Sequence, residues 1–481
     1  MGQNDQPMGI DAGDIPMSIS PDSSAPLYLQ LAEQLQALIE SRALPAATKL
    51  PSTRALARAI GVNRNSVVAA FERLTNSGHL ETHGRHGTLV STLASPSRVA
   101  LVRRAKRVSA ADDSTDSVTD FRLGSVDPNP LPINVWRRAC REAGRQLPGS
   151  GYGDPQGEAN LRAQIALYLG RTHAMHVEPS QVLITAGSGQ AIERIAEIAL
   201  PTSGLGAFED PGYPRAADSF RRAGGRLLPI PVDEDGLDTE VLVRQRTPPR
   251  VIHVTPAHQY PLGARLSSSR RHALITWARK HGSLIIENDY DGEFRYDSPP
   301  LPALASLAGF DHVAYVGTFS KVLTPAIRLG FVVGNIRLIR SLAEVIDRTR
   351  ESISIVTQRI MAWMIKSGEL EKHIRRTRRH YRSRRMAMLR ALGEVPEVIC
   401  LSGQSAGLHV VVELQPEISA RDICARLKRA GILVDRVSDF QFAKMDDKRL
   451  LMAYAHLPEC EIVKGVRKLA RALKPEREGV R

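Results

Sequence analysis

From Phe121 onward, short apolar runs of the kind found in strands alternate with stretches whose apolar residues recur at helical spacing. The strand-like runs are Gln181–Thr185, Gly206–Phe208, Val251–Val254, Ser283–Ile286, Val313–Val316 and Phe331–Val333. Strands that alternate with helices are typical of an α/β domain built on a mainly parallel, doubly wound sheet. Ligands of such sheets bind beyond the carboxyl ends of the strands, so we expect the residues that follow these runs to lie close together.

The residues that follow the runs are suited to hold a phosphorylated aromatic molecule. Ser188 and Gly189 open a helix after the first run, where free backbone amides attract a phosphate. Tyr213 and Arg215 follow the second run, and the tyrosine face can stack on an aromatic ring. The fourth run is followed by Asn288, Asp289 and Tyr290, and the fifth by Thr318, Ser320, Lys321 and Arg328. These two sets offer partners for ring atoms, and an amine nucleophile beside a phosphate clamp.

The N-terminal part has a different pattern, that of a helix-turn-helix. A first helix is predicted from Leu31, Leu35, Leu38 and Ile39. Ser52 is the expected N-cap of a second helix over 53–60, which buries Leu56 with Ala59 or Ile60 and stops at Gly61. Asn63 is expected to cap a third helix, with Val67, Phe71 and Leu74 on its buried side. Residues 80–82 and 88–91 then form a two-stranded wing, and such a module lays one helix in the DNA major groove.

The charge distribution supports a nucleic-acid partner for this part of the chain. The net charge of the whole chain is +14, and residues 26–107 carry twelve lysines and arginines against four glutamates. A basic segment of this kind attracts a polyanion. We predict a disordered arm over 1–25, a winged helix-turn-helix over 26–94, a linker over 95–120 and an α/β domain over 121–475.

The stretch LPSTRALARAIGVNRNSVVAAFERLTNSGHLETHGRHGTLV, which begins at Leu50, resembles the winged helix of the GntR family of regulators, and the match extends over about seventy residues. The resemblance implies that the chain binds double-stranded DNA at an operator. It implies that Arg54 and Arg64 approach phosphates or base edges, that Asn63, Asn65 and Ser66 begin the recognition helix, and that Arg85 and His86 lie on the wing. The alternative is that these arginines are solvated surface charges.

The order of motifs after the linker resembles that of fold-type I aminotransferases. The motifs are Tyr152–Gly157, AGSGQ, EDPGYPR, PAHQYPLG, ENDYDGEFRY and GTFSKVLTPAIRLG. The resemblance is greatest to the MocR subgroup, in which a GntR winged helix precedes such a domain. It implies a pyridoxal phosphate-binding α/β fold with a parallel-rich sheet and a small C-terminal α+β subdomain.

By this resemblance, each motif acquires a role toward pyridoxal 5'-phosphate. Lys321 would hold the cofactor as a Schiff base, Tyr213 would stack on its ring, and Tyr290 would bond its phenolic oxygen. Ser188, Gly189, Thr318, Ser320 and Arg328 would surround the phosphate, and Tyr152 would reach it from a neighbouring subunit. A homodimer with a head-to-tail arrangement is therefore implied.

Two positions depart from the family pattern. The usual aspartate against the pyridine nitrogen is Asn288 here, and Asp289 would serve only if the strand register shifted by one residue. The arginine that clamps the substrate carboxylate is replaced by Asp439, although Arg436 or Arg215 could compensate. Both departures weaken transamination more than cofactor binding. They favour pyridoxal phosphate itself, or an amine, over an ordinary α-amino acid as the effector.

A strongly basic stretch, His373–Leu389, has two interpretations. It could contact DNA, or it could be a long amphipathic helix with Ile374, Tyr381 and Met388 turned inward, and we favour the helix. The four cysteines are scattered without metal-ligand spacing, so we predict neither a metal site nor disulfides. No run is long and apolar enough for a membrane span, and no signal peptide is recognised, so we expect a cytoplasmic protein.

Three functions remain open from the sequence. The first is a pyridoxal phosphate-dependent transcription regulator that senses the cofactor, an amine or an amino acid through its large domain. The second is a working aminotransferase that carries a DNA-binding domain. The third is a DNA-binding regulator whose large domain is only a scaffold for dimerisation.

Overall fold

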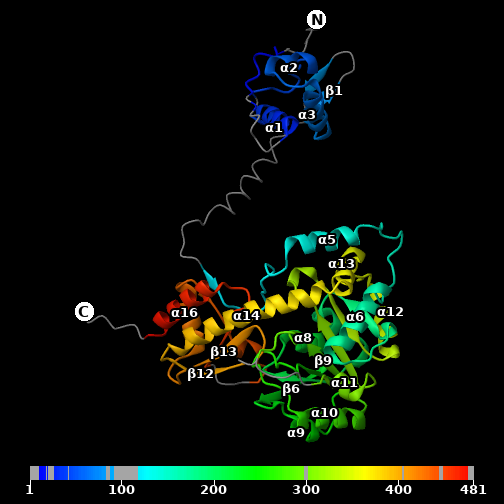
Figure 1. The fold of residues 1–481 in the computed structure, drawn as a ribbon, viewed down its shortest axis with the longest axis vertical. Helices are drawn as coiled ribbons and strands as arrows, with labels where there is room; N and C mark the ends of the chain where they lie inside the picture. The colour runs from blue at the N-terminus through cyan, green and yellow to red at the C-terminus, as the bar shows by residue number, and fades with distance from the viewer. Residues whose placement is uncertain are drawn as a thin grey trace, which may run out of the picture. The chain divides into compact units, whose positions relative to one another are not determined.

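The computed structural model describes residues 10–17, 19, 26–41, 43–82, 87–91, 118–296, 302–403, 406–443 and 448–474. The chain divides into two compact units, Met1–Thr115 and Asp116–Arg481 (Figure 1). The predicted wing residues Arg85 and His86, and most of the predicted linker, lie outside the described residues. None of the helices in the described ranges is long and apolar enough to cross a membrane.

The first unit is a winged helix, as predicted. It contains α1 Leu27–Glu40, α2 Thr53–Ile60, α3 Arg64–Asn76 and the antiparallel strands β1 Leu80–Thr82 and β2 Thr88–Val90. Both predicted caps are present, because Ser52 Oγ accepts the amide of Ala55 at 3.2 Å and Asn63 Oδ1 accepts that of Asn65 at 2.9 Å. Gly61 ends α2 with φ +70°, a conformation that glycine adopts without steric cost.

Two predictions for this unit need correction. Ala57, and not Ala59 or Ile60, is buried beside Leu56, because the buried side of α2 faces the core at positions 56 and 57. Part of the predicted disordered arm is also ordered, since Ile15 is buried in the core of the winged helix and the amide of Ile10 donates to the carbonyl of Lys49. Apolar residues at positions 10, 15, 17 and 19 explain this packing.

The second unit is built on an eight-stranded sheet with the order β4-β11-β10-β9-β8-β5-β6-β7. The pairs formed by β10 with β9, β9 with β8, β8 with β5 and β5 with β6 are parallel, whereas β11 is antiparallel to both of its neighbours. The six predicted strands are all present, and β6 and β7 were missed. The bounds are β4 Val182–Thr185, β5 Leu205–Asp210, β6 Arg226–Asp233, β7 Gly236–Leu237, β8 Val251–Val254, β9 Leu284–Asp289, β10 Val313–Thr318 and β11 Gly330–Val333.

Helices cover both faces of this sheet. One face packs against α7 Ser188–Ala199, α8 Pro214–Arg222 and α12 Ile336–Thr349. The other face packs against α5 Ile133–Ala143, α6 Ala159–His173, α10 Ser268–His281, α11 Leu304–Ala308 and α13 Ile355–Lys366, while α9 Thr239–Val243 lies beside α10. Because successive strand residues point to opposite faces, Ile286 belongs to the first core and Ile285 to the second. This alternation decides where the residues at the end of β9 point.

A smaller α+β subdomain follows α14 Glu369–Gly393, as the resemblance implied. Its sheet has the order β12-β13-β16-β15, and α15 and α16 pack on the same core. The bounds are β12 Val398–Ser402, β13 His409–Leu414, β15 Asp435–Arg436, β16 Arg449–Ala453, α15 Ala420–Arg429 and α16 Glu459–Leu473. A separate parallel pair joins β14 Ile432–Leu433 to β3 Thr119–Asp120. Residues 119 and 120 therefore belong to the large unit and not to the predicted linker.

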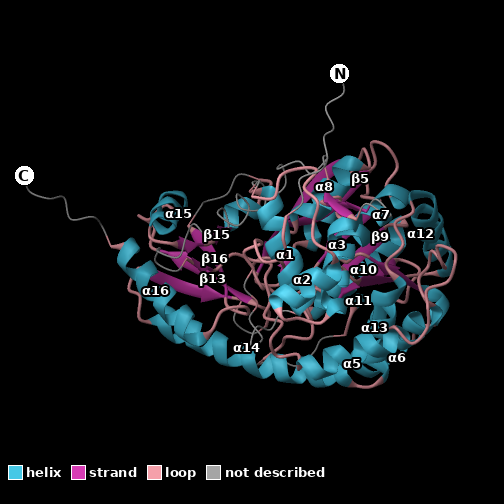
Figure 2. Ribbon diagram, turned by 90° about the horizontal axis from the view of Figure 1, so that it is seen from above, coloured by secondary structure: helices cyan, strands magenta, loops and turns pink. Residues whose placement is uncertain are grey.

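The basic stretch is the central part of α14, which runs from α13 to α16 (Figures 1 and 2). Ile374, Tyr381 and Met388 are all buried, which confirms the predicted amphipathic helix. Arg384 bonds Asp127 and the carbonyl of Ala455, so at least one of its basic side chains acts within the fold.

Candidate active site

A cavity of about 590 Å³ opens at the carboxyl ends of β4, β5, β9 and β10. It is lined by ten of the residues predicted for the site: Ser188, Gly189, Tyr213, Arg215, Asn288, Tyr290, Thr318, Ser320, Lys321 and Arg328. Its volume lies within the ordinary range for small-molecule sites, roughly 300–1,000 Å³. The parallel strands thus bring together residues that are up to 140 positions apart in the chain (328 − 188).

Lys321 supplies the amine of this cavity. It follows β10, and its Nζ donates to the carbonyl of Gly124 at 2.8 Å. Burial lowers the pKa of Lys321, although Asp291 opposes this shift. A lowered pKa increases the fraction of neutral amine, which is the form that attacks a carbonyl carbon.

One end of the cavity is suited to a phosphate. The amides of Ser188 and Gly189 begin α7, after Gly187 with φ +96°. A Cβ at Gly187 would come within 3.8 Å of both Ser320 Oγ and Thr318 Oγ1, so the hydroxyl groups face the same helix start. The side chain of Arg215 lies near Gly189. Tyr213 hydrogen-bonds Ser188, and the charges of Arg215 and Arg328 partly offset the rise in its pKa that burial causes. Amides, hydroxyls and guanidinium groups together form an anion site.

The middle of the cavity is suited to a neutral aromatic ring. The Tyr213 ring lies roughly parallel to the ring of His253, with centroids 6.2 Å apart and planes 29° apart. Burial lowers the pKa of His253 to about 3, so this histidine is neutral, and its Nε2 lies 3.3 Å from Asn288 Nδ2. Asn288 Oδ1 is buried and has no hydrogen-bond partner in the part of the chain that the structure describes. An orphaned amide oxygen in a cavity is a ready partner for a ligand.

Tyr290 is held by a buried pair behind it. The phenol lies 2.9 Å from His258 Nδ1, which is also 2.9 Å from Asp291 Oδ2. Burial raises the pKa of Tyr290 well above its ordinary value, so the phenol stays protonated. A fixed, neutral phenol can donate to a ring oxygen of a bound ligand.

The prediction that Asp289 belongs to the cofactor site is wrong, because the register of β9 is not shifted. Asp289 points to the face opposite Asn288, where its Oδ2 accepts the Tyr315 phenol at 2.8 Å and lies 3.3 Å from His173 Nε2. The Asp289 and Asn288 side chains are therefore separated by the sheet itself.

Only one of the three residues predicted to bind an effector lines the cavity. Arg215 lines the cavity, but Asp439 and Arg436 do not. They lie around the 3₁₀ turn Val437–Phe440 and form an ion pair, with Nη2 of Arg436 2.5 Å from Oδ1 of Asp439. Because Arg436 is paired with Asp439, it is a poor replacement for the arginine that binds the substrate carboxylate in the family. Tyr152 is 77% exposed, with the Arg350 guanidinium 4.7 Å from its ring centroid, and it does not line the cavity of its own chain.

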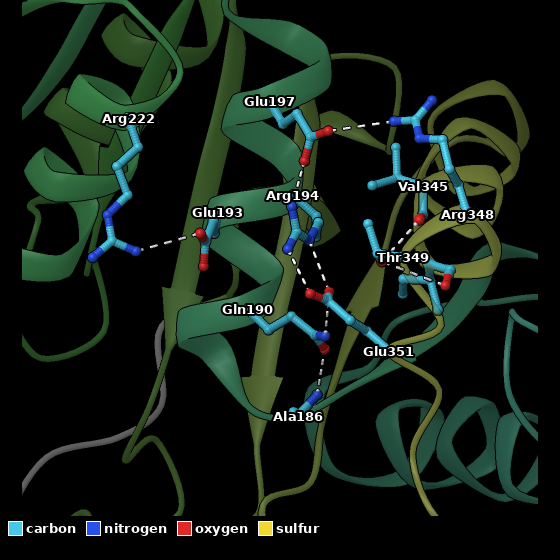
Figure 3. Close-up of polar contacts among 11 residues, drawn as sticks. Ala186, Gln190, Glu193, Arg194, Glu197, Arg222, Val345, Arg348, Thr349 and Glu351 are labelled. Carbon is cyan, nitrogen blue, oxygen red and sulfur yellow. Dashed lines mark hydrogen bonds and ion pairs between the residues drawn. The ribbon is translucent and has the colours of Figure 1, made fainter.

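Gln190, Arg194 and Glu351 also line the cavity, although the sequence did not predict them as site residues. Figure 3 shows Gln190 and Arg194 of α7 pointing to Glu351, which lies between α12 and α13. Glu351 accepts Arg194 Nη2 at 2.8 Å and Gln190 Nε2 at 3.0 Å, while Gln190 Oε1 accepts the amide of Ala186 at 2.7 Å. This chain of bonds fixes the loop that precedes α7. Gln190 belongs to a motif that the sequence offered, but nothing local in the sequence marks Glu351.

Tyr260 is a second missed residue, although it lies in the motif PAHQYPLG. It lines the cavity, and its ring meets that of Tyr213 edge to face with centroids 5.6 Å apart. Aromatic pairs of this geometry hold each other in place. Tyr260 therefore fixes the ring on which a ligand would stack.

In the winged helix, the residues proposed to meet DNA lie around the start of α3. Arg54, Asn63, Arg64 and Asn65 are exposed and Ser66 is half-buried. The Asn63 side-chain oxygen is used by the cap, which leaves its amide nitrogen for other contacts. An exposed helix start with arginine and asparagine side chains is typical of a major-groove reader.

Comparison with known proteins agrees with both units. Residues 119–469 match the family described as aminotransferase class I and II, and residues 27–90 match the bacterial regulatory proteins of the gntR family. The chain is 32% identical to the pyridoxine biosynthesis transcriptional regulator PdxR of Corynebacterium glutamicum, over 83% of this chain and 86% of that protein. It is 29% identical to the probable rhizopine catabolism regulatory protein MocR of Rhizobium meliloti, over 94% of each. The crystal structure of LysN, an α-aminoadipate aminotransferase of Thermus thermophilus complexed with N-(5'-phosphopyridoxyl)-L-leucine, is 30% identical with a TM-score of 0.68, over 74% of this chain and 92% of that one.

The fold and the site thus define a class, that of winged-helix proteins fused to an aminotransferase class I and II domain. The chain belongs to the MocR subgroup of the GntR family of transcription regulators.

The cofactor of this class is pyridoxal 5'-phosphate, and the cavity residues fit it. The buried Lys321 amine and the amide and hydroxyl cradle at Ser188 match its aldehyde and phosphate. The Asn288 side-chain amide lines the ring site, and with its amide nitrogen turned toward the ligand it would donate to an unprotonated ring nitrogen. When bound, this cofactor supplies an aldehyde that bonds covalently to amines and a ring that withdraws electrons.

Proposed function

We propose that this protein binds operator DNA through the start of α3 and uses the cavity around Lys321 to sense pyridoxal phosphate, or an amine or amino acid that reacts with it. The observation that carries this proposal is the neutral environment of the ring site. Asn288 and the neutral His253 offer hydrogen bonds without charge. Such a site binds the cofactor but does little to hold its ring nitrogen protonated.

The residues of the cavity have distinct tasks in this proposal. The buried amine of Lys321 holds the cofactor, and Ser188, Gly189, Thr318, Ser320 and Arg328 bind its phosphate. Tyr213 covers one face of the ring, and Tyr290 donates to the ring oxygen. If an amine from solution took the place of the Lys321 amine on the cofactor, the contacts on the cavity side of β10 would change. A ligand shifts a regulator only by binding its two states unequally, so this exchange has to alter the DNA-binding geometry.

A homodimer is part of the proposal, and aminotransferase domains are commonly dimeric. The exposed Tyr152 and the Arg350 stacked on its ring are available to a second chain. We propose that Tyr152 reaches the phosphate site of the partner, in a head-to-tail arrangement. Two winged helices in one dimer would then read two half-sites.

A working aminotransferase is the second candidate, and the likeness to LysN favours it. The cavity holds the amine that this chemistry needs. Against it stand the neutral Asn288 and the absence of an arginine at position 439. Incubation with a panel of amino acids, followed by the absorbance of the bound cofactor, separates the candidates. Full conversion with a common amino acid would make the protein an enzyme.

The cofactor part of the proposal is tested by reduction with borohydride. We expect purified protein incubated with pyridoxal phosphate to absorb visible light, and reduction to fix the cofactor on the peptide that contains Lys321. Lys321→Ala should abolish both the visible absorbance and the adduct. A colourless wild-type protein without an adduct would leave the large unit as a scaffold only.

The DNA part is tested by selecting bound genomic fragments with and without pyridoxal phosphate. Arg64→Ala should weaken binding to a selected fragment by about 1–3 kcal/mol. Arg73→Ala is a matched control, because Arg73 is exposed near the other end of α3. Equal affinities for both variants would contradict the assignment of Arg64, and the cofactor spectrum should be unchanged in both.

A further inference from the structure

A second cavity, of about 350 Å³, lies on the side of β9 opposite the cofactor site. It is bounded by the end of α6, the segment after β9 and the first turns of α14. Its charged lining residues are His173, Glu293, Arg295, Glu371, Arg375 and Arg378. The cavity therefore presents both carboxylates and guanidinium groups, and its volume is at the lower end of the usual range for small ligands, roughly 300–1,000 Å³.

The carboxylates that line this cavity have unused hydrogen-bonding capacity. Glu371 Oε1 accepts Arg171 at 2.6 Å, but Glu371 Oε2 is buried and lacks a partner within the described ranges. Glu293 Oε1 accepts the Tyr168 phenol at 3.0 Å. Burial raises the pKa of Glu293, and the charge of Asp289 adds to this shift. A cationic group placed here would satisfy the orphaned oxygen and reverse the cost of burying these acids.

Two of the guanidinium groups that line the cavity have no side-chain partner among the described residues. Arg375 is one helical turn from Glu371, at a spacing where opposite charges usually pair, and yet no ion pair joins them. Among the described residues, neither Arg375 nor Arg295 makes a hydrogen bond or an ion pair with a side chain. Arg378 is different, because it donates to the carbonyl of Glu293 at 2.9 Å through Nε. The guanidinium groups of Arg375 and Arg295 therefore have donors left for an anion, and the charge of Arg295 also acts on Asp289 and His173.

We propose that this second cavity binds a small zwitterion, with its ammonium group on Glu371 and Glu293 and its carboxylate on Arg375 and Arg295. Carboxylates with spare hydrogen-bonding capacity and guanidinium groups without a side-chain partner line the same cavity, and together they match a molecule with both charges better than a simple anion or a simple cation. The chemical class is that of amino acids. Recognition here needs no carboxylate clamp at position 439, which the cofactor site lacks.

The position of the cavity connects it to the cofactor site through β9. His173 lines the second cavity and lies 3.3 Å from Asp289, and Asp289 is adjacent to Asn288 in the strand. A ligand that repositions His173 would act on the residue next to the ring partner of the cofactor. This coupling rests on the proposed function, whereas binding in the second cavity does not.

The test measures binding of radiolabelled β-alanine to full-length protein whose cofactor has been fixed by borohydride. Reduction removes the reactive aldehyde, so an amine can no longer be captured at Lys321. Propionate and propylamine serve as probes with the same chain length and only one of the two charges. We expect β-alanine to bind at one site per chain, and each single-charge probe to bind at least about ten-fold more weakly, since each lost charge-assisted bond contributes roughly 1.5–3 kcal/mol.

Arg375→Gln should reduce β-alanine binding at least about ten-fold, as expected for loss of one charged hydrogen bond. Arg379→Gln should leave binding unchanged, because Arg379 is an exposed arginine of the same helix that does not line the cavity. The proposal is overturned if the reduced protein binds no β-alanine, or if the two variants bind it equally. If no cofactor is trapped at all, the proposed function fails, and β-alanine binding can still be measured on the untreated protein.

Discussion

The two faces of strand β9 differ in charge although they are formed by adjacent residues. On one face, Asn288 meets a neutral histidine and lines the cofactor cavity. On the other face, Asp289 meets His173, and each member of the pair shifts the pKa of the other toward the charged form against the effect of burial. The acid that the family usually places beside the cofactor has its nearest counterpart here on the opposite side of the sheet.

A strand can thus keep an aspartate in the local sequence and still remove its charge from the active site. The sheet alternation assigns the two residues to separate environments. The cofactor side is then suited to binding, and the other side to a charged, structurally tight cluster.

The largest effect is expected from Asp289→Asn. It leaves His173 and Tyr315 without their carboxylate, and removing one member of a buried ion pair usually costs about 3–5 kcal/mol. Urea denaturation should show this loss in the free energy of unfolding of the large unit, while Asp311→Asn, at an exposed position before β10, should show almost none. Trapping of the cofactor on Lys321 should be unaffected. If Asp289→Asn instead abolished cofactor trapping and left the free energy of unfolding unchanged, Asp289 would be the ring partner, and the proposed difference between the two faces of β9 would be wrong.

A smaller effect is expected from Asn288→Asp. The new carboxylate would hold the ring nitrogen protonated with a charge-assisted bond, which contributes about 1.5–3 kcal/mol. Amino-group transfer from an amino acid should accelerate roughly 10- to 150-fold, measured in a single turnover by absorbance. An unchanged rate would mean that the neutral partner is not what limits this chemistry.

The smallest effect is expected from His173→Gln, and it depends on pH. Burial lowers the pKa of His173, but the Asp289 carboxylate outweighs it and raises the pKa above its ordinary value. The contribution of His173 to the free energy of unfolding is therefore complete below its ordinary pKa and is lost as pH rises through the raised value. Burial also opposes the lowered pKa of Asp289, whose contribution is present above its ordinary pKa and is lost as pH falls through the lowered value. Urea denaturation at a series of pH values measures this contribution. Between the pKa of Asp289 and that of His173, the free energy of unfolding of wild type should exceed that of the variant by about 1–3 kcal/mol. A difference that does not vary with pH would contradict the ion pair.

The sequence predicted well those features that depend on neighbours in the chain. The caps of α2 and α3, and the cofactor-site residues that follow β4, β5 and β10, were found because capping and strand ends have local patterns. Strand alternation also favoured Asn288 over Asp289, and Asn288 is the one of the two that lines the cavity. The prediction kept Asp289 only because register cannot be fixed without the partner strands.

The features that were missed depend on long-range contacts. Glu351 reaches Gln190 and Arg194 from a segment more than 150 residues away, and no local pattern marks it. The pairing of Asp439 with Arg436 depends on a short 3₁₀ turn, and the charge at position 439 was therefore expected to face a ligand. The second cavity joins α6, the end of β9 and α14, which are close only in the folded chain.

We propose that a cofactor bound at Lys321 changes the affinity of the protein for its operator. The most direct measurement is the affinity for one selected DNA fragment with and without pyridoxal phosphate, in wild type and in Lys321→Ala. We expect the cofactor to change the wild-type affinity by about 1–3 kcal/mol, the usual range for coupling between two sites, and to leave the variant unchanged. Equal wild-type affinities with and without bound cofactor would contradict the account.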